Sequence, residues 1–121
     1  MLLADPQTNR RLLEHLVNFH EDAAAELLVI DIADQNAVAH AVEKLRALGS
    51  ALPFPHQSAI RAASPLRELR PKAGRCRWRA IYAQAGDGFV ILAVVPEAQV
   101  DRRGFDAGVA RASKRLLEVT S

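Results

Sequence analysis

The sequence predicts a small α+β domain in which helices pack against an antiparallel sheet. Three observations support this class. Apolar residues recur at helical spacing in the first half of the chain and again near its end. Between them lie three strand-like runs, joined by turns too short for a crossover connection. Half of the 121 residues are hydrophobic and a quarter are charged, as in globular domains that need no disulfide or metal for stability.

The beginning of the chain is the least regular part. Residues 1–11 form a polar lead-in, and we expect a single domain over residues 12–119. Residues 12–19 fit a strand or a helix, because their apolar positions match both periods. The residue pattern alone therefore leaves this first element undecided.

Two helices are predicted next. Residues 21–31 have helical composition, and residues 34–48 carry an apolar stripe at helical spacing. Asp34 is the expected N-cap of the second helix, and Gly49 stands where a C-terminal glycine is favoured. The prolines that follow cannot continue a helix, so we expect residues 49–64 to form a structured connection.

Three strands are predicted over Leu66–Pro71, Cys76–Gln84 and Gly88–Val95. Turns that contain Gly74 and Gly86 separate them, and turns this short join antiparallel neighbours. The last strand is apolar on both faces, which predicts that it is covered on both sides.

A final helix is predicted from about Asp101 or Gly104 to Val119. Its buried face is marked by apolar residues at helical spacing, beginning with Phe105. The order is strand or helix, two helices, three strands and a helix, so the helices are segregated from the sheet.

Charge is distributed unevenly along the chain. Residues 1–55 carry a net charge of −4 and residues 56–121 a net charge of +6, which together give +2. Between Arg61 and Arg79 there are seven cations and one anion, Glu68. Such a cluster can bind a polyanion, and it can equally form a solvated basic surface.

Several classes of protein are not expected. The longest apolar run, Phe89–Val95, is far too short for a membrane helix, and the N-terminus has no secretory pattern. The single cysteine, Cys76, cannot form an internal disulfide. We therefore expect a cytoplasmic protein that makes no use of a membrane, and we expect Cys76 to be an inert core thiol. The spacing of histidines and cysteines predicts no metal, and no motif predicts a cofactor.

The strand that contains Arg77 and Arg79 is the main candidate for chemistry. Side chains alternate along a strand, so these two arginines share one face and the apolar residues share the other. Guanidinium groups on one face lie about 7 Å apart, close to the spacing of phosphates in a nucleic acid. Arg70 comes from the neighbouring strand. In the alternative arrangement, Glu68 pairs with an arginine of the adjacent strand.

Four segments together resemble the RelE/HigB family of bacterial toxins, in particular its phage-derived-protein-like branch. They are Leu52–His56 (LPFPH), Leu66–Pro71 (LRELRP), Trp78–Tyr82 (WRAIY) and Val90–Leu92 (VIL). The resemblance covers about residues 12–119. It implies a small RelE-like fold, a strand over residues 12–19, and a sheet flanked by an N-terminal helix pair and a C-terminal helix.

The resemblance also implies a function. Many members cleave messenger RNA on the ribosome without a metal, and an antitoxin, often a helix-turn-helix protein, neutralises them. By residue, Arg70 and Arg79 match the catalytic arginines of the family. The remaining cations expected to contact nucleic acid are Arg67, Lys72, Arg75, Arg77, Arg102 and Arg103.

One departure from the family pattern leaves a second function open. Active members usually carry basic residues or a histidine after the last strand, where this chain has Pro96 and Glu97. A glutamate repels phosphate, although Arg102 and Arg103 follow a few residues later. The alternative is a RelE-like module that binds an antitoxin or RNA and cuts weakly or not at all.

Overall fold

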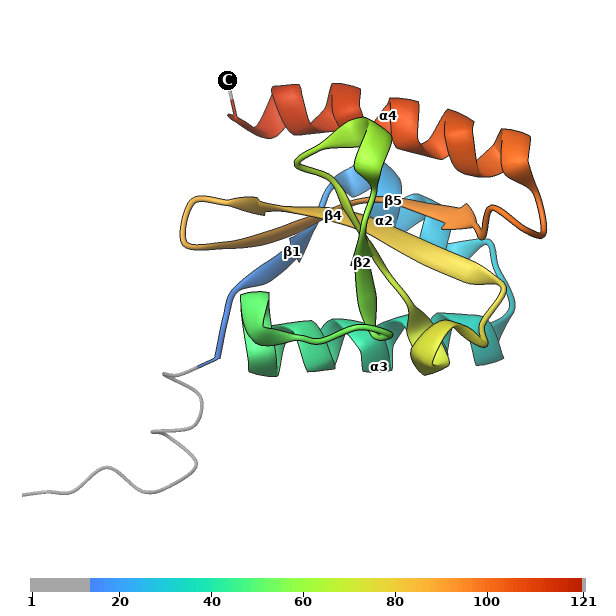
Figure 1. Cartoon of the computed structure of the whole chain (residues 1–121), viewed down its shortest axis with the longest axis horizontal. Helices are drawn as coiled ribbons and strands as arrows, with labels where there is room; N and C mark the ends of the chain where they lie inside the picture. Colours follow the sequence, from blue (N-terminus) through green and yellow to red (C-terminus); the bar gives the residue numbers. More distant parts are fainter. Residues whose placement is uncertain (1–13, 121) are drawn as a thin grey trace, which may run out of the picture.

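The computed structural model describes residues 14–120 and places a five-stranded sheet between helices. Figure 1 shows α4 on one side of the sheet and α3 on the other. The elements follow in the order β1 (Val17–Phe19), α2 (Glu21–Leu28), α3 (Ile32–Leu48), η1 (Gly49–Ala51), β2 (Gln57–Ala59), η2 (Arg61–Ala63), β3 (Arg67–Leu69), η3 (Pro71–Gly74), β4 (Trp78–Ala85), β5 (Gly88–Pro96) and α4 (Arg102–Thr120). The α+β class expected from the sequence is confirmed. The predicted lead-in, residues 1–11, lies outside the described residues.

The sheet is mixed rather than fully antiparallel. Its strand order is β1-β5-β4-β3-β2, and the three pairs from β5 to β2 are antiparallel, as expected. β1 pairs with β5 in parallel, with Val17 opposite Phe89. The strand implied for residues 12–19 is present over its last three residues as β1, while residues 12 and 13 lie outside the described residues. Its parallel direction was not predicted.

Some boundaries differ from the predictions because short elements give little periodic pattern. β2 lies inside the stretch expected to be a connection, and it adds an outer strand next to β3. β3 is shorter than the predicted strand over residues 66–71, since the chain turns at Pro71 into η3. α3 begins after Asp31 rather than at the expected cap Asp34. Gly49 ends it with a φ of +56°, a conformation that favours glycine.

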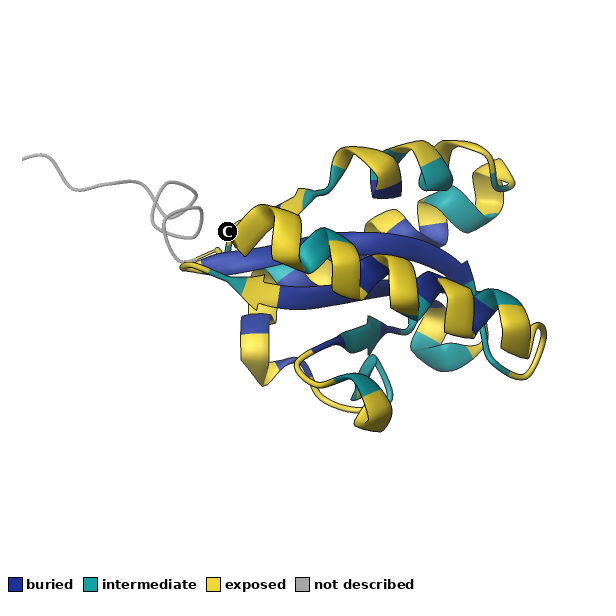
Figure 2. Cartoon of the chain, turned by 90° about the horizontal axis from the view of Figure 1, so that it is seen from above, coloured by how far each residue is buried: buried dark blue, intermediate teal, exposed yellow. Residues whose placement is uncertain are grey.

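Two apolar clusters cover the two faces of the sheet. Figure 2 shows β4 and β5 buried along nearly their whole length. Tyr82 and Ile91 face α2 and α3, whereas Ile81 and Leu92 face α4. Burial of β5 on both faces confirms the prediction made from its continuous apolar sequence.

Two charged side chains bond to the backbone groups of β5 that lie beyond its pairing with β1. The pairing passes from Ile81–Ala93 to Tyr82–Ile91, so β5 has one extra residue, Leu92. Arg115 donates from Nη1 to the Leu92 carbonyl (2.8 Å), and Glu26 accepts from the Val94 amide (2.9 Å). These two side chains also bond to each other at 2.8 Å. Backbone groups that β1 is too short to reach are therefore satisfied by an ion pair.

The environment of Glu26 shifts its ionisation. Burial raises the pKa of this carboxyl group, but hydrogen bonds from Arg115 and the Val94 amide, with the charges of Arg111 and Arg115, outweigh burial. The net effect is a pKa below the ordinary value for glutamate.

Within residues 14–120, no helix has the length and apolar character needed to cross a membrane.

Candidate functional site

Arg79 lies in β4 on the face toward α4, and its guanidinium is buried. Only 4% of its side chain is exposed. An arginine has five N–H donors. In Arg79 each of them bonds to a protein oxygen: Nε to Glu68 (3.2 Å), Nη1 to the carbonyls of Cys76 (2.7 Å) and Trp78 (3.0 Å), and Nη2 to the carbonyl of Gly74 (3.2 Å) and the carboxylate of Glu97 (2.6 Å). No donor is left for another ligand unless one of these partners moves.

Glu68 joins the two arginines that were expected to be catalytic. Its Oε1 accepts from Arg79 Nε and, at 2.8 Å, from Arg70 Nη1. Arg70 also donates from Nε to the Pro55 carbonyl at 3.0 Å and lies over the Phe54 ring at 5.6 Å. The alternative arrangement considered for the sequence, with Glu68 bound to an arginine of the adjacent strand, is therefore present.

We call the hollow around these groups the Arg79 cavity. It has a volume of about 310 Å³. The residues that line it are Glu68, Arg70, Gly74, Arg79, Glu97, Ala98 and Gln99. Its two arginines and two glutamates balance in formal charge. The cavity therefore differs from the expected row of free guanidinium groups, because carboxylates from β3 and from the end of β5 reach the same place.

Arg67 lies on the opposite face of the sheet. It donates from Nε to Gln57 Oε1 at 2.8 Å and also bonds to the Tyr82 side chain. Burial raises the pKa of Tyr82, and Arg67 offsets only part of that effect. Tyr82 is 2% exposed and belongs to the apolar cluster on the α3 side of the sheet.

The other cations expected to contact nucleic acid are spread over several surfaces. Arg75 is exposed and donates to the Lys72 carbonyl (3.1 Å), while Arg77 borders a groove beside the start of α4. Arg102 and Arg103 are exposed at the start of α4, and Arg102 pairs with Asp106 at 3.4 Å. Of the expected site residues, Arg70 and Arg79 line one cavity, Lys72 lines a different pocket together with Arg70, and the others lie on separate surfaces.

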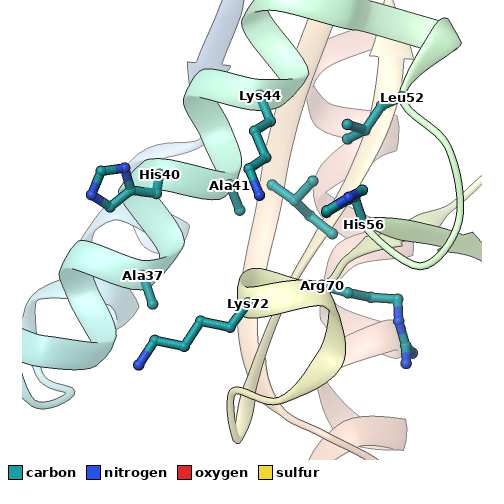
Figure 3. A pocket seen from close by; sticks show the side chains of 9 residues that line it. Ala37, His40, Ala41, Lys44, Leu52, His56, Arg70 and Lys72 are labelled. Atoms are coloured by element: carbon teal, nitrogen blue, oxygen red, sulfur yellow. The ribbon is translucent and has the colours of Figure 1, made fainter.

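A second hollow, which we call the α3–η3 pocket, lies on the opposite side of the sheet from Arg79. Its volume is about 200 Å³. The residues that line it are Ala37, His40, Ala41, Lys44, Leu52, His56, Leu69, Arg70 and Lys72. Figure 3 shows Lys44 and His56 directed toward the pocket and Lys72 extending toward α3, whereas the guanidinium of Arg70 turns away.

The sequence analysis assigned no role to His40 or Lys44. The only available signal was the spacing of Ala37, Ala41 and Lys44 on one face of α3.

Cys76 is buried, as expected, with Sγ 3.8 Å from Asp34 Oδ1. In the part of the chain that the structure describes, no three His, Cys, Asp or Glu side chains are grouped to hold a metal.

Comparison with known proteins gives a family. A family model described as Phage derived protein Gp49-like (DUF891) matches residues 25–95. The match extends from α2 to the end of β5, more than half of the chain, and includes Glu68, Arg70 and Arg79. No curated protein matches the chain. The matched family is a toxin-like group related to RelE and HigB, as the sequence motifs implied. The chain belongs to this Gp49-like family of phage-derived proteins.

Proposed function

We propose that the protein is the toxin of a type II toxin–antitoxin system and cleaves messenger RNA on the ribosome without a metal. The family supports the first part of this proposal. The second part rests on one observation: two arginines and two glutamates meet at a single cavity of about 310 Å³. Cleavage needs cations to stabilise a charged phosphorane and a base to accept a proton, and both residue types are present.

We assign Glu97 as the proton acceptor and Glu68 as the positioning residue. Glu68 binds both Arg70 and Arg79, whereas Glu97 binds only Arg79. The side chain of Glu97 is 22% exposed. In the proposed step, an RNA phosphate replaces the Glu97 carboxylate at Arg79 Nη2. Glu97 then accepts the proton of the ribose 2′-hydroxyl while the ribose 2′-oxygen forms a bond to phosphorus. The bond to the 5′-oxygen breaks, a 2′,3′-cyclic phosphate forms, and water protonates the leaving oxygen.

The same proposal defines partners and location. A toxin of this kind requires a cognate antitoxin, and we propose a helix-turn-helix protein. Messenger RNA and the ribosome place the protein in the bacterial cytoplasm. The exposed Arg102 and Arg103 stand close after Gln99, which lines the Arg79 cavity, and we propose that they contact the RNA backbone.

A second function is favoured by the saturation of Arg79. Because its five donors are engaged and the cavity has no net formal charge, the same fold can hold an antitoxin or RNA without cutting it. In this case Arg79 is a structural residue. Antitoxin binding occurs under both functions and does not distinguish them.

A cleavage assay with translating ribosomes distinguishes the two functions. We expect the wild-type protein to cut messenger RNA and to arrest growth when it is induced without its antitoxin. Glu97→Gln should abolish both effects while the protein remains folded. Glu43→Gln, which alters the same kind of group on the exposed side of α3, should retain both. Absence of cleavage and arrest by the wild type would establish the second function, and full activity of Glu97→Gln would exclude Glu97 as the base.

A further inference from the structure

The α3–η3 pocket carries basic side chains that have no acidic partner. Lys44 and Lys72 border it from opposite sides, with His40 and His56 beside them, and no acidic residue lines it. Among residues 14–120, none of these four side chains takes part in an ion pair. Unpaired cations around a concave surface attract an anion, because low-dielectric walls concentrate their field.

The floor of the pocket is apolar. Ala37 and Ala41 lie one turn apart on α3, and their small side chains leave the space that Leu52 and Leu69 border from the other side. All four residues are buried, so the floor that they form is shielded from solvent. An anion that fits here must therefore carry an apolar or aromatic portion as well as its charge.

The backbone presents Lys72 in an unusual way. Lys72 and Ala73 have φ values of +55° and +54°, in the left-handed region that side chains with a Cβ rarely adopt. Such conformations cost free energy and persist where the surrounding structure determines them. Here they direct the Lys72 ammonium group away from the Arg79 cavity and toward α3 (Figure 3).

We propose that the α3–η3 pocket binds a single nucleotide, with its phosphate between Lys44 and Lys72 and its base on the apolar floor beside His56. The volume of about 200 Å³ is below the range of pockets that enclose a drug-sized ligand, so the pocket can enclose part of one nucleotide, with the remainder at its mouth. A carboxylate alone would leave the apolar floor uncovered. The nucleotide is either free in solution or one unit of an RNA strand, and the two sources share this chemistry.

This site is independent of the proposed cleavage. It faces α3, whereas Arg79 faces α4, and Arg70 borders both hollows but turns its guanidinium toward Glu68. Loss of nucleotide binding would leave the Arg79 cavity intact. Loss of cleavage through Glu97→Gln would likewise leave nucleotide binding intact, so the two proposals fail separately.

Titration calorimetry of the full chain provides the test. The probes are the four nucleoside 5′-monophosphates, inorganic phosphate, a short single-stranded RNA and an acidic peptide. We expect Lys44→Gln and Lys72→Gln each to weaken nucleotide binding about tenfold, as the loss of a hydrogen bond to a charged group predicts. Lys114→Gln, which removes the same charge from the exposed side of α4, is the matched control and should change nothing.

Each outcome decides the matter. Binding of monophosphates that depends on Lys44 and Lys72 supports the site and identifies a free nucleotide as the ligand. Dependence on these lysines with RNA alone supports the site with RNA as the source. Three results overturn the proposal. They are the absence of binding by both the monophosphates and the RNA, an equal loss of binding with Lys114→Gln, and binding of phosphate or the acidic peptide as tight as that of the nucleotides.

Discussion

The two hollows of this protein use cations in opposite ways. In the Arg79 cavity the guanidinium groups are bonded to Glu68 and Glu97, and the formal charge is balanced. In the α3–η3 pocket Lys44 and Lys72 are unpaired, and the charge is positive. A cluster of cations in the sequence therefore does not indicate where an anion binds. What decides is whether carboxylates from other parts of the chain reach the same place.

The largest expected effect is on stability, and it tests the paired charges of the Arg79 cavity. Arg79→Ala removes a donor from Glu97, from three backbone carbonyls and from Glu68, which keeps only Arg70. Removing one partner of a buried charge pair costs about 3–5 kcal/mol. Urea unfolding should show a loss of this size in the free energy of unfolding. Arg103→Ala, at an exposed position, should change it by less than about 0.5 kcal/mol. Similar small losses for both variants would mean that Arg79 is not held as described.

Glu26 offers a second paired carboxylate with a pH dependence. Its pKa is lowered in the folded protein, so its contribution to stability is present above the unfolded-state pKa and is lost as the pH falls through the folded value. Glu26→Gln should reduce the free energy of unfolding by about 1–2 kcal/mol at neutral pH. The difference from the wild type should disappear in acid. A constant difference across the pH series would contradict the assigned shift.

Lys72→Gly tests the α3–η3 pocket. Glycine adopts the left-handed conformation without steric cost, so the variant should gain about 1 kcal/mol in the free energy of unfolding. It should also lose nucleotide binding. Lys114→Gly, in the interior of α4, should instead lose about 1 kcal/mol. A destabilised Lys72→Gly would show that the strained backbone at residue 72 does not oppose folding.

The smallest effect is expected at Lys44. Because Lys44 is exposed and makes no ion pair among the described residues, Lys44→Gln should change the free energy of unfolding by less than about 0.5 kcal/mol. Thermal unfolding measured beside Arg79→Ala gives the contrast directly. A large loss with Lys44→Gln would show that this lysine supports the fold.

The elements with strong local patterns were predictable from the sequence. The alternation and apolar run of β4 and β5 gave their positions within two residues, and the stripe of α3 gave its body and its end at Gly49. β2 was missed because three residues in a proline-rich stretch carry no period. The parallel pairing of β1 depends on a contact with Phe89, more than 70 positions along the chain, which local patterns do not contain.

The site was predictable only in part for the same physical reason. Strand alternation placed Arg79 on the face opposite the apolar residues of its strand, and pairing of Glu68 with an arginine of the adjacent strand was the alternative considered. The pairing of β3 with β4 follows from the short turn between them. The saturation of Arg79 needs Glu97, which meets it only after β5 returns beside β4. The α3–η3 pocket combines residues from three segments, so no single stretch of sequence reveals it.

The ion pair of Glu26 and Arg115 has a consequence for assembly. With the Val94 amide and the Leu92 carbonyl occupied, and the Val17 carbonyl bonded to Arg46, this margin of the sheet has few backbone groups left for another chain. The outer side of β2 has no such charged protection among residues 14–120. If another chain extended the sheet by a strand, the edge left to it would therefore be β2, which lies at the opposite end of the strand order from β1.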